Sequence, residues 1–237
     1  MTDTSSSAAA PAPPSGDPTG TQRFWEDFYR AGPVWSGRPN ALLVREVEGL
    51  TPGSALDVGC GEGADAIWLA RLGWRVTAAD ASATAVARAG EHAAEAGVTV
   101  DWQVHDLART FPAGVFDLVS SSYLHTPDEV AGLRESVLRR AAQAVAPGGL
   151  LVVVGHERHE RHPDAHLPTA AQVLAGLDLD PARWSVERAE AVDRELIDPD
   201  GNPAVRRDNV LRVRRHRVGD ADDVLRPRAA EPVTPGP

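Results

Sequence analysis

Residues 55–70 read ALDVGCGEGADAIWLA, and this stretch decides the fold. An apolar run leads into Asp57, glycines alternate at Gly59, Gly61 and Gly63, and a nearly apolar segment follows. Glycine permits both a sharp turn and the close approach of a ligand to the backbone. The stretch therefore predicts a strand, a ligand-binding turn and a buried helix. A tight turn without a ligand is the alternative.

Outward from this stretch, apolar runs alternate with helical patterns. We expect strands at 54–58, 75–79, 98–104, 116–120 and 150–154, helices at 64–72, 82–96 and onward from residue 126, and two late strands at 184–191 and 209–215. Such alternation predicts an α/β fold, a doubly wound, mostly parallel sheet with helices on both faces. Ligands bind such sheets beyond the carboxyl ends of the strands.

Three of the expected helices have explicit start signals. Ser82 is placed to cap one helix, Thr126 precedes a proline in a second, and Thr169 with Gln172 forms a capping box in a third. The Pro-Gly-Gly sequence at 147–149 is expected to end the second of these helices.

Composition limits the classes of partner. The chain has 237 residues and a formal net charge of −10, which argues against general nucleic-acid binding because phosphate contacts need clustered cations. The arginine-rich run at 211–217 is interpreted as an edge strand with charged outward residues. Residues 21–218 are expected to form one domain between two disordered tails, 1–20 and 219–237, which offer little to bury.

The cysteine content and hydropathy suggest where the protein works. Cys60 is the only cysteine, so no intramolecular disulfide can form. No apolar run approaches the roughly 20 residues needed to span a bilayer, and the N-terminus does not resemble a signal peptide. We expect a cytoplasmic protein that does not interact with membranes.

Two further acids follow expected strands. Asp80 ends the second strand, where its carboxylate could accept both ribose hydroxyl protons; the alternative is a loop residue that caps the next helix. Asp106 follows the third strand, where it could accept from an adenine amine while Leu107 offers a backbone N–H. An ordinary turn aspartate is the alternative there.

The glycine spacing separates two cofactor classes. A dinucleotide fingerprint is G-x-G-x-x-G, with a helix N-terminus placed against a pyrophosphate. Here the pattern is D-x-G-x-G-x-G, one residue shorter between the last glycines. S-adenosylmethionine has no phosphate, and Asp57 suits its sulfonium and ammonium groups. The spacing thus favours S-adenosylmethionine over a nicotinamide cofactor.

The segment 25–40 is rich in aromatic residues. Four of them could form a lid over the cofactor: Trp25, Phe28, Tyr29 and Trp35. Arg38 could pair with the cofactor carboxylate. An amphipathic helix packed on the sheet, with a solvated arginine, is the alternative.

Histidines occur in two places near the expected site. His125 follows the fourth strand and could take a proton from a methyl acceptor; a structural role in the following turn is the alternative. Four more crowd one loop: His156, His159, His162 and His166. Their spacing matches no zinc motif. We therefore predict no metal site and favour a solvated loop.

The chain resembles class I S-adenosylmethionine-dependent methyltransferases. The resemblance covers residues 22–216 and rests on ALDVGCGEGADAIWLA, RVTAADAS, WQVHDL, FDLVSSSYLH and VAPGGLLVVVGHE. The segment WEDFYRAGPVWSGRPN is similar to the start of the small-molecule branch that includes tellurite-resistance and thiopurine methyltransferases.

The resemblance implies a Rossmann-like, seven-stranded sheet whose last strand pair is antiparallel. It implies that S-adenosylmethionine contacts the three glycines, that Asp80 with Ala81 holds the ribose, and that Asp106 holds the adenine. Ser121 and Ser122 would lie beneath the methionine part.

The function predicted is methyl transfer to a small molecule. The alternatives are a nicotinamide-dependent oxidoreductase and a non-catalytic S-adenosylmethionine-binding module. Residues 121–124 read SSYL where an Asn-Pro-Pro-aromatic motif would favour a nucleic-acid or protein amine. The acceptor's identity and the oligomeric state stay open.

Overall fold

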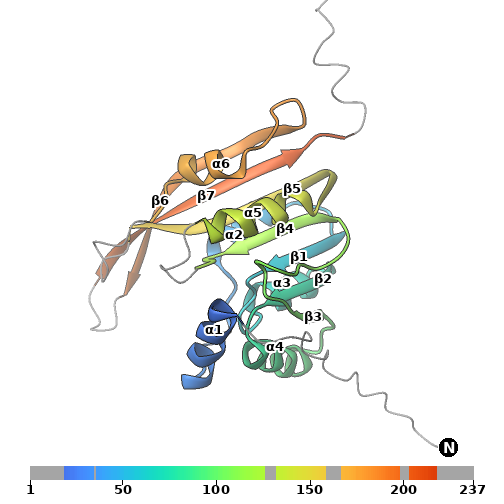
Figure 1. The fold of residues 1–237 in the computed structure, drawn as a ribbon, viewed down its shortest axis with the longest axis vertical. Coiled ribbons are helices and arrows are strands. Elements are labelled where there is room, and N and C mark those ends of the chain that lie inside the picture. The colour runs from blue at the N-terminus through green and yellow to red at the C-terminus, as the bar shows by residue number, and fades with distance from the viewer. Residues whose placement is uncertain (1–18, 35, 126–131, 159–166, 198–202, 218–237) are drawn as a thin grey trace, which may run out of the picture.

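One seven-stranded sheet forms the centre of the molecule (Figure 1). The computed structural model describes residues 19–34, 36–125, 132–158, 167–197 and 203–217. Its strands are β1 (Ser54–Val58), β2 (Arg75–Asp80), β3 (Asp101–Val104), β4 (Phe116–Ser122), β5 (Val145–Arg158), β6 (Trp184–Ile197) and β7 (Pro203–Arg215). The order across the sheet is β3-β2-β1-β4-β5-β7-β6. Strands β1 to β5 pair in parallel, and β7 is antiparallel to both neighbours. The predicted fold class is confirmed.

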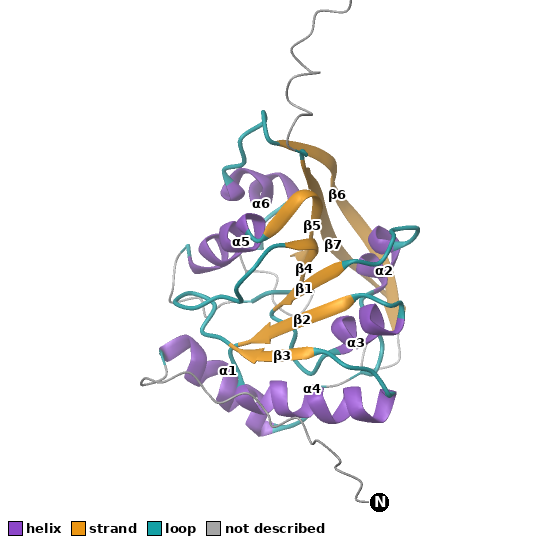
Figure 2. Ribbon diagram, turned by 90° about the vertical axis from the view of Figure 1, so that its right-hand side faces the viewer, coloured by secondary structure: helices purple, strands orange, loops and turns teal. Residues whose placement is uncertain are grey.

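Helices cover both faces of the sheet (Figure 2). They are α1 (Gly20–Ala31), α2 (Ala41–Val47), α3 (Ala64–Arg71), α4 (Ala83–Ala96), α5 (Leu133–Gln143) and α6 (Ala170–Leu177). Helices α5 and α6 lie on one face, α2 and α3 on the other, and α1 packs against α4 beyond the ends of β1 and β2. In the described residues, no helix has the length and hydropathy needed to span a membrane.

Alternate residues of the central strands build two cores. Leu56 and Leu151 belong to the core beneath α5 and α6, whereas Ala55 and Leu150 belong to the core beneath α2 and α3. Successive side chains of a strand point to opposite faces, so a strand covered on both faces needs a continuous apolar run. The run at 150–154, every residue of which is buried, meets this requirement.

Two predicted helix starts are confirmed. The Ser82 hydroxyl accepts a hydrogen bond from the backbone N–H of Ala85 at 3.1 Å, which caps α4. Thr169 and Gln172 form the reciprocal capping box of α6. Thr19 caps α1, so Thr19 and Gly20, which the expected tail included, begin a helix.

The helix expected from Thr126 to the Pro-Gly-Gly sequence is interrupted and ends earlier than expected. Gly132 has φ 75°, a left-handed conformation that a helix cannot continue through, so α5 begins at Leu133; residues 126–131 lie outside the described residues. The helix ends at Gln143, and 147–149 belongs to β5 instead. A Cβ on Gly149 would lie 2.9 Å from the carbonyl oxygen of Asp117, so glycine lets this segment approach β4 closely.

The interpretation of residues 211–217 as an edge strand is also wrong. β7 lies between β5 and β6, and β6 is the edge. Both late strands are longer than expected, while β3 begins at Asp101, later than expected. Leu211 and Val213 are buried, whereas Arg212 and Arg214 point to the other face. Long-range order within a sheet is not a property of local sequence, which is why the pattern misled.

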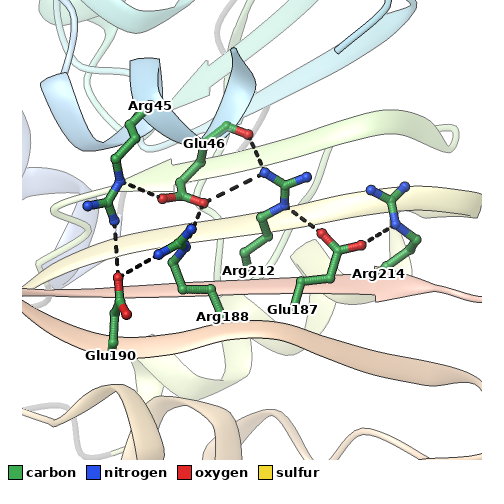
Figure 3. Close-up of polar contacts among 7 residues, drawn as sticks. All are labelled: Arg45, Glu46, Glu187, Arg188, Glu190, Arg212 and Arg214. Carbon is green, nitrogen blue, oxygen red and sulfur yellow. Dashed lines mark hydrogen bonds and ion pairs between the residues drawn. The ribbon is translucent and has the colours of Figure 1, made fainter. Parts of the chain in front are cut away.

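The charged face of β6 and β7 packs against α2 through ion pairs (Figure 3). The Glu46 side chain is 1% exposed, and its carboxylate meets Arg45 at 2.9 Å, Arg188 at 3.2 Å and Arg212 at 3.7 Å. The surrounding pairs are Arg188 with Glu190, Arg45 with Glu190, and Glu187 with both Arg212 and Arg214. A charge so deeply buried requires such partners.

We expect Glu46→Gln to lower the free energy of unfolding by about 1.5–3 kcal/mol, the usual contribution of hydrogen bonds to a charged group. Urea denaturation monitored by circular dichroism measures this. The matched control is Glu190→Gln, whose side chain is 46% exposed and which should cost less than about 1 kcal/mol. Equal losses in the two variants would contradict the assigned role of Glu46.

Candidate active site

Four carboxylates gather where β1, β2 and β3 end. Asp57 and Asp80 close β1 and β2, Asp106 follows β3, and Asp65 lies in the first turn of α3. All four side chains are buried, with exposures between 2% and 8%. Parallel strands finish at one edge of the sheet, so acids far apart in sequence meet there.

The three predicted glycines have left-handed backbones, with φ of 76° at Gly59, 54° at Gly61 and 90° at Gly63. A Cβ on Gly61 would lie 2.7 Å from the Tyr29 hydroxyl, and one on Gly63 would lie 2.6 Å from the Trp102 ring. Glycine is therefore required at these positions both by conformation and by close packing.

Asp80 holds the glycine loop in place. Its Oδ2 accepts from the backbone N–H of Gly61 at 2.9 Å, and its Oδ1 accepts from that of Ser82 at 2.9 Å. Burial raises the pKa of Asp80, and these two hydrogen bonds partly offset the rise. The expected role in holding a ribose stays a prediction, while the alternative is partly right because Asp80 supports the start of α4.

Two cavities open at this edge, and both are lined by Gly59 and Tyr123. The apolar cavity, about 350 Å³, lies among α1, α5 and the ends of β2 and β3, with Phe24, Trp25, Leu124 and Val137 in its wall. The polar cavity, about 740 Å³, lies between β1, the segment before α2, and β6. Together they form one site with an apolar half and a polar half.

The structure brings most predicted site residues into these walls. The apolar cavity is lined by Asp80, Ala81, Asp106, Leu107, His125, Trp25, Phe28 and Tyr29. The polar cavity is lined by Asp57, Gly59, Ser122 and Arg38. Trp35 lies outside the described residues. Ser121 is turned away, since its hydroxyl donates to the carbonyl oxygen of Val58 at 3.1 Å.

Four buried polar atoms in the walls have no hydrogen-bond partner among the described residues: Asp57 Oδ2, Asn40 Nδ2, Ser122 Oγ and Asp106 Oδ2. The first three line the polar cavity and the fourth lines the apolar cavity. Buried polar atoms in proteins are normally satisfied. One unpaired amide donor, two unpaired carboxylate acceptors and one hydroxyl therefore fit a ligand with an anionic or carbonyl group, an ammonium and an amine.

The polar cavity is adapted to positive charge. Burial, reinforced by the neighbouring Asp65 carboxyl, raises the pKa of Asp57 well above its ordinary value. Burial also raises the pKa of Asp65, opposed by the hydrogen bond that it accepts from the backbone N–H of Asn40. A cationic ligand would relieve the desolvation of both acids.

Helix α1 carries the predicted lid aromatics and is tied to its neighbours at two points. Glu26 accepts from the Ser82 hydroxyl at 2.7 Å and from the Thr84 hydroxyl at 2.6 Å, at the start of α4. Arg88 donates to the Tyr29 carbonyl oxygen at 2.9 Å and pairs with Glu62 at 2.8 Å. No residue of α1 is fully buried, so the helix is attached by polar contacts and leaves aromatic surface facing the cavity.

Sequence reasoning missed four residues of the site: Asn40, Tyr123, Arg194 and Asp208. Tyr123 has φ 53°, which costs a non-glycine residue about 1–3 kcal/mol and commonly marks a functional site. Asn40 caps α2, and an Asn directly before a helical pattern was a usable signal. Arg194 and Asp208 lie on β6 and β7 and gave no local signal.

Among the described residues, the histidine and cysteine positions carry no metal or redox signal. His156 contacts Asp208 at 2.8 Å, while His159, His162 and His166 lie outside the described residues. In the part of the chain that the structure describes, no group of three or more metal-ligating side chains occurs. Burial raises the pKa of the Cys60 thiol, which disfavours the reactive thiolate.

We expect the attachment of α1 to weaken in acid. Burial opposes ionisation of Glu26, but hydrogen bonds from Thr84 and Ser82 prevail and lower the pKa of Glu26 from 4.5 to about 2. A lowered folded-state pKa contributes stability that is present above pH 4.5 and is lost as pH falls towards 2. The melting temperature of wild type should therefore exceed that of Glu26→Gln at neutral pH, and the difference should shrink below pH 4.5. Asp27→Asn, an exposed neighbour, is the control; a difference independent of pH would contradict the assignment.

Comparison with known proteins agrees with this geometry. Residues 55–149 match the model of a family described as a methyltransferase domain. The 2-heptyl-1-hydroxyquinolin-4(1H)-one methyltransferase of Mycobacteroides abscessus is 35% identical over 159 residues, which are 62% of this chain and 70% of that protein. A ubiquinone biosynthesis O-methyltransferase of Methylobacterium sp. is 37% identical over 130 residues, 54% of this chain; the chain spans about half, 51%, of that relative.

Among solved structures, TehB from Haemophilus influenzae has the same fold, with a TM-score of 0.59 and 17% identity over 83% of this chain and 67% of that one. The Mycobacteroides abscessus methyltransferase is 35% identical to this chain, and the match covers 70% of its length. This similarity establishes the family. The chain belongs to the class I S-adenosylmethionine-dependent methyltransferases of the small-molecule type.

Proposed function

We propose that the protein transfers the methyl group of S-adenosylmethionine to a hydroxyl oxygen of a small molecule with an apolar body. The observation that carries the proposal is the two-part cavity, in which most of the unpaired polar atoms face one half and aromatic side chains face the other. One relative is named an O-methyltransferase, and another is named for a substrate that carries a 1-hydroxy group; both names support an oxygen acceptor.

The unpaired atoms suggest how the cofactor is held. In the polar cavity, Asp57 would receive the ammonium, Asn40 and Arg38 the carboxylate, and Ser122 would lie beneath the methionine chain. In the apolar cavity, Asp80 would receive the ribose hydroxyls, with Ala81 beside them. Asp106 and the backbone of Leu107 would receive the adenine.

Between these two halves, Gly59 would lie beside the sulfonium, with Gly61 and Gly63 shaping the loop. When bound, S-adenosylmethionine supplies an electrophilic methyl group. The residues of this chain align the acceptor with that methyl group and exclude water. Alignment alone provides a large part of the rate enhancement in such transfers.

The buried acids argue against the oxidoreductase alternative. A dinucleotide would place two phosphate charges close to Asp57, Asp65 and Asp80, whose burial already raises their pKa values. Like charges at such a site repel strongly in a medium of low dielectric constant. A sulfonium and an ammonium are attracted instead.

The acceptor body would lie beneath α1, in the part of the apolar half that the ribose and adenine leave free, beside Leu124 and His125. Phe24 and Phe28 are 48% and 45% exposed, although both line the apolar cavity. Aromatic surface left uncovered in this way is available to a hydrophobic ligand. The lid role of α1 is part of this proposal, as is a contribution from Trp35 and the pairing of Arg38.

His125 is the proposed proton acceptor for the hydroxyl. Its side chain is exposed and lines the apolar cavity beside Tyr123. A neutral imidazole within reach of the hydroxyl would make the oxygen nucleophilic as the methyl group transfers.

The cellular setting forms part of the proposal. We propose a cytoplasmic enzyme that acts on a small molecule and not on nucleic acid, with residues 21–218 as its domain and short tails on either side. A single, partly buried cysteine fits a reducing compartment. The net charge of −10 disfavours a polyanionic partner.

Calorimetry with S-adenosylhomocysteine and with NAD tests the cofactor assignment. We expect binding of S-adenosylhomocysteine only, weakened about ten- to a hundredfold by Asp80→Ala, since a hydrogen bond to a charged group contributes about 1.5–3 kcal/mol. Asp101→Ala is the control, because Asp101 begins β3 and lines neither cavity. This variant should bind S-adenosylhomocysteine as tightly as wild type. Preferential binding of NAD would refute the assignment.

A steady-state assay tests the role of His125. With 2-heptyl-1-hydroxyquinolin-4(1H)-one as the probe acceptor, His125→Ala should lower kcat about a hundredfold at neutral pH and leave the affinity for S-adenosylhomocysteine unchanged. The loss should shrink at higher pH, where the acceptor ionises without help. An unchanged kcat would mean that alignment suffices and that His125 is not the base.

A further inference from the structure

A buried carboxylate joins four strands beside the site. Asp208 of β7 is fully buried. Its Oδ2 accepts from the Tyr123 hydroxyl at 2.8 Å and from Arg194 Nε at 2.9 Å, and its Oδ1 contacts His156 Nδ1 at 2.8 Å. Tyr123 follows β4, His156 lies on β5 and Arg194 on β6. One anion therefore fixes three side chains from three other strands.

Asp208 and Tyr123 hold Arg194 in place and leave some of its hydrogen-bond donors available to a ligand. Burial opposes ionisation of Asp208, but hydrogen bonds from His156, Tyr123 and Arg194 prevail and hold the pKa of Asp208 below its ordinary value. Arg194 donates through Nε to Asp208 and through Nη2 to the Tyr123 hydroxyl at 3.2 Å. Its Nη1 has no partner among the described residues. A guanidinium has five donors, so donors remain for a ligand.

Arg194 lines the polar cavity together with Tyr123, and Tyr123 also lines the apolar one. Gly59, the other residue common to both cavities, lies where the two halves of the cofactor would meet. The Tyr123 ring is held by its hydroxyl bonds and by stacking on His156, with ring centroids 4.2 Å apart. A fixed cation thus lines the polar cavity next to Tyr123, one of the two residues that the cavities share.

We propose that Arg194 binds the ionised oxygen of the methyl acceptor, and that Asp208 is the positioning residue that aims Arg194 and Tyr123 at it. This inference rests on the proposed function and narrows the substrate class to acceptors whose hydroxyl is acidic, such as phenols and N-hydroxy heterocycles. The preference follows because a guanidinium favours an anionic oxygen over a neutral hydroxyl.

The chemical step balances with these groups. The acceptor hydroxyl loses its proton to His125 or to solvent, and the resulting oxygen anion lies against Arg194. That oxygen forms the new O–C bond as the C–S bond breaks and its electron pair returns to sulfur. The products are the methyl ether and S-adenosylhomocysteine, and no further reactant is needed.

The test uses the full chain saturated with S-adenosylhomocysteine. We expect it to bind 4-nitrophenol, an acidic phenol, more tightly than phenol at pH 8, and to hold 4-nitrophenol as the coloured phenolate at a lower pH than free solution does. Arg194→Gln should weaken binding of the phenolate about ten- to a hundredfold and abolish the shift in its absorbance titration. Arg194→Lys, which keeps the charge without the planar fork, should fall between the two.

Arg188→Gln is the matched control. Arg188 lies on the same strand and pairs with the buried Glu46, but it does not line either cavity. It should leave phenolate binding unchanged. The inference is overturned if wild type binds neither probe or does not prefer the phenolate, or if the two glutamine variants behave alike. If Arg194→Gln does not fold, Arg194→Lys against wild type decides.

S-adenosylhomocysteine binding by wild type is measured first, and its failure would count against the proposed function instead. Loss of phenolate preference with cofactor binding intact counts against the inference on Arg194 alone.

Discussion

The hydrogen bonds of one carboxylate connect the parts of this site. Asp80 accepts from Gly61 in the loop after β1 and from Ser82 at the start of α4. Ser82 in turn caps α4 and donates to Glu26, which attaches α1. The glycine loop, the helix beside it and the helix above the cavity therefore depend on a single side chain at the end of β2. Displacing that side chain would loosen all three.

The parts that the sequence predicts are those encoded locally. The apolar run before Asp57 and the glycines after it specify strand, turn and helix within residues 54–71, and the ends of parallel strands then place Asp80 and Asp106 beside them. Contacts made over long separations were not predictable. Asp208 meets Tyr123 across 85 positions, and the insertion of β7 beside β5 depends on the whole sheet. Gly132 shows the same limit on a smaller scale, because one left-handed residue interrupts an otherwise regular helical pattern.

The acids that suit the site to its cofactor also lower the stability of the folded protein when no cofactor is bound. Four buried carboxylates around one loop are costly to desolvate, and Asp57 Oδ2 and Asp106 Oδ2 have no partner among the described residues. A ligand that binds only the folded state stabilises that state. Cofactor binding and folding are thus linked through the same atoms, and residues chosen for recognition are not those that would maximise stability.

The edge strand β6 has a consequence for how molecules of this protein meet at high concentration. A strand of 14 residues at the edge of a sheet presents unpaired backbone N–H and C=O groups. A strand of another chain could pair with these groups and extend the sheet. Charges of both signs recur along it, and Glu187, Arg188 and Glu190 are already engaged by neighbours within the same molecule. A strand that paired with this edge would have to disturb these ion pairs. The edge of β6 therefore resists the edge-to-edge pairing that leads to aggregation.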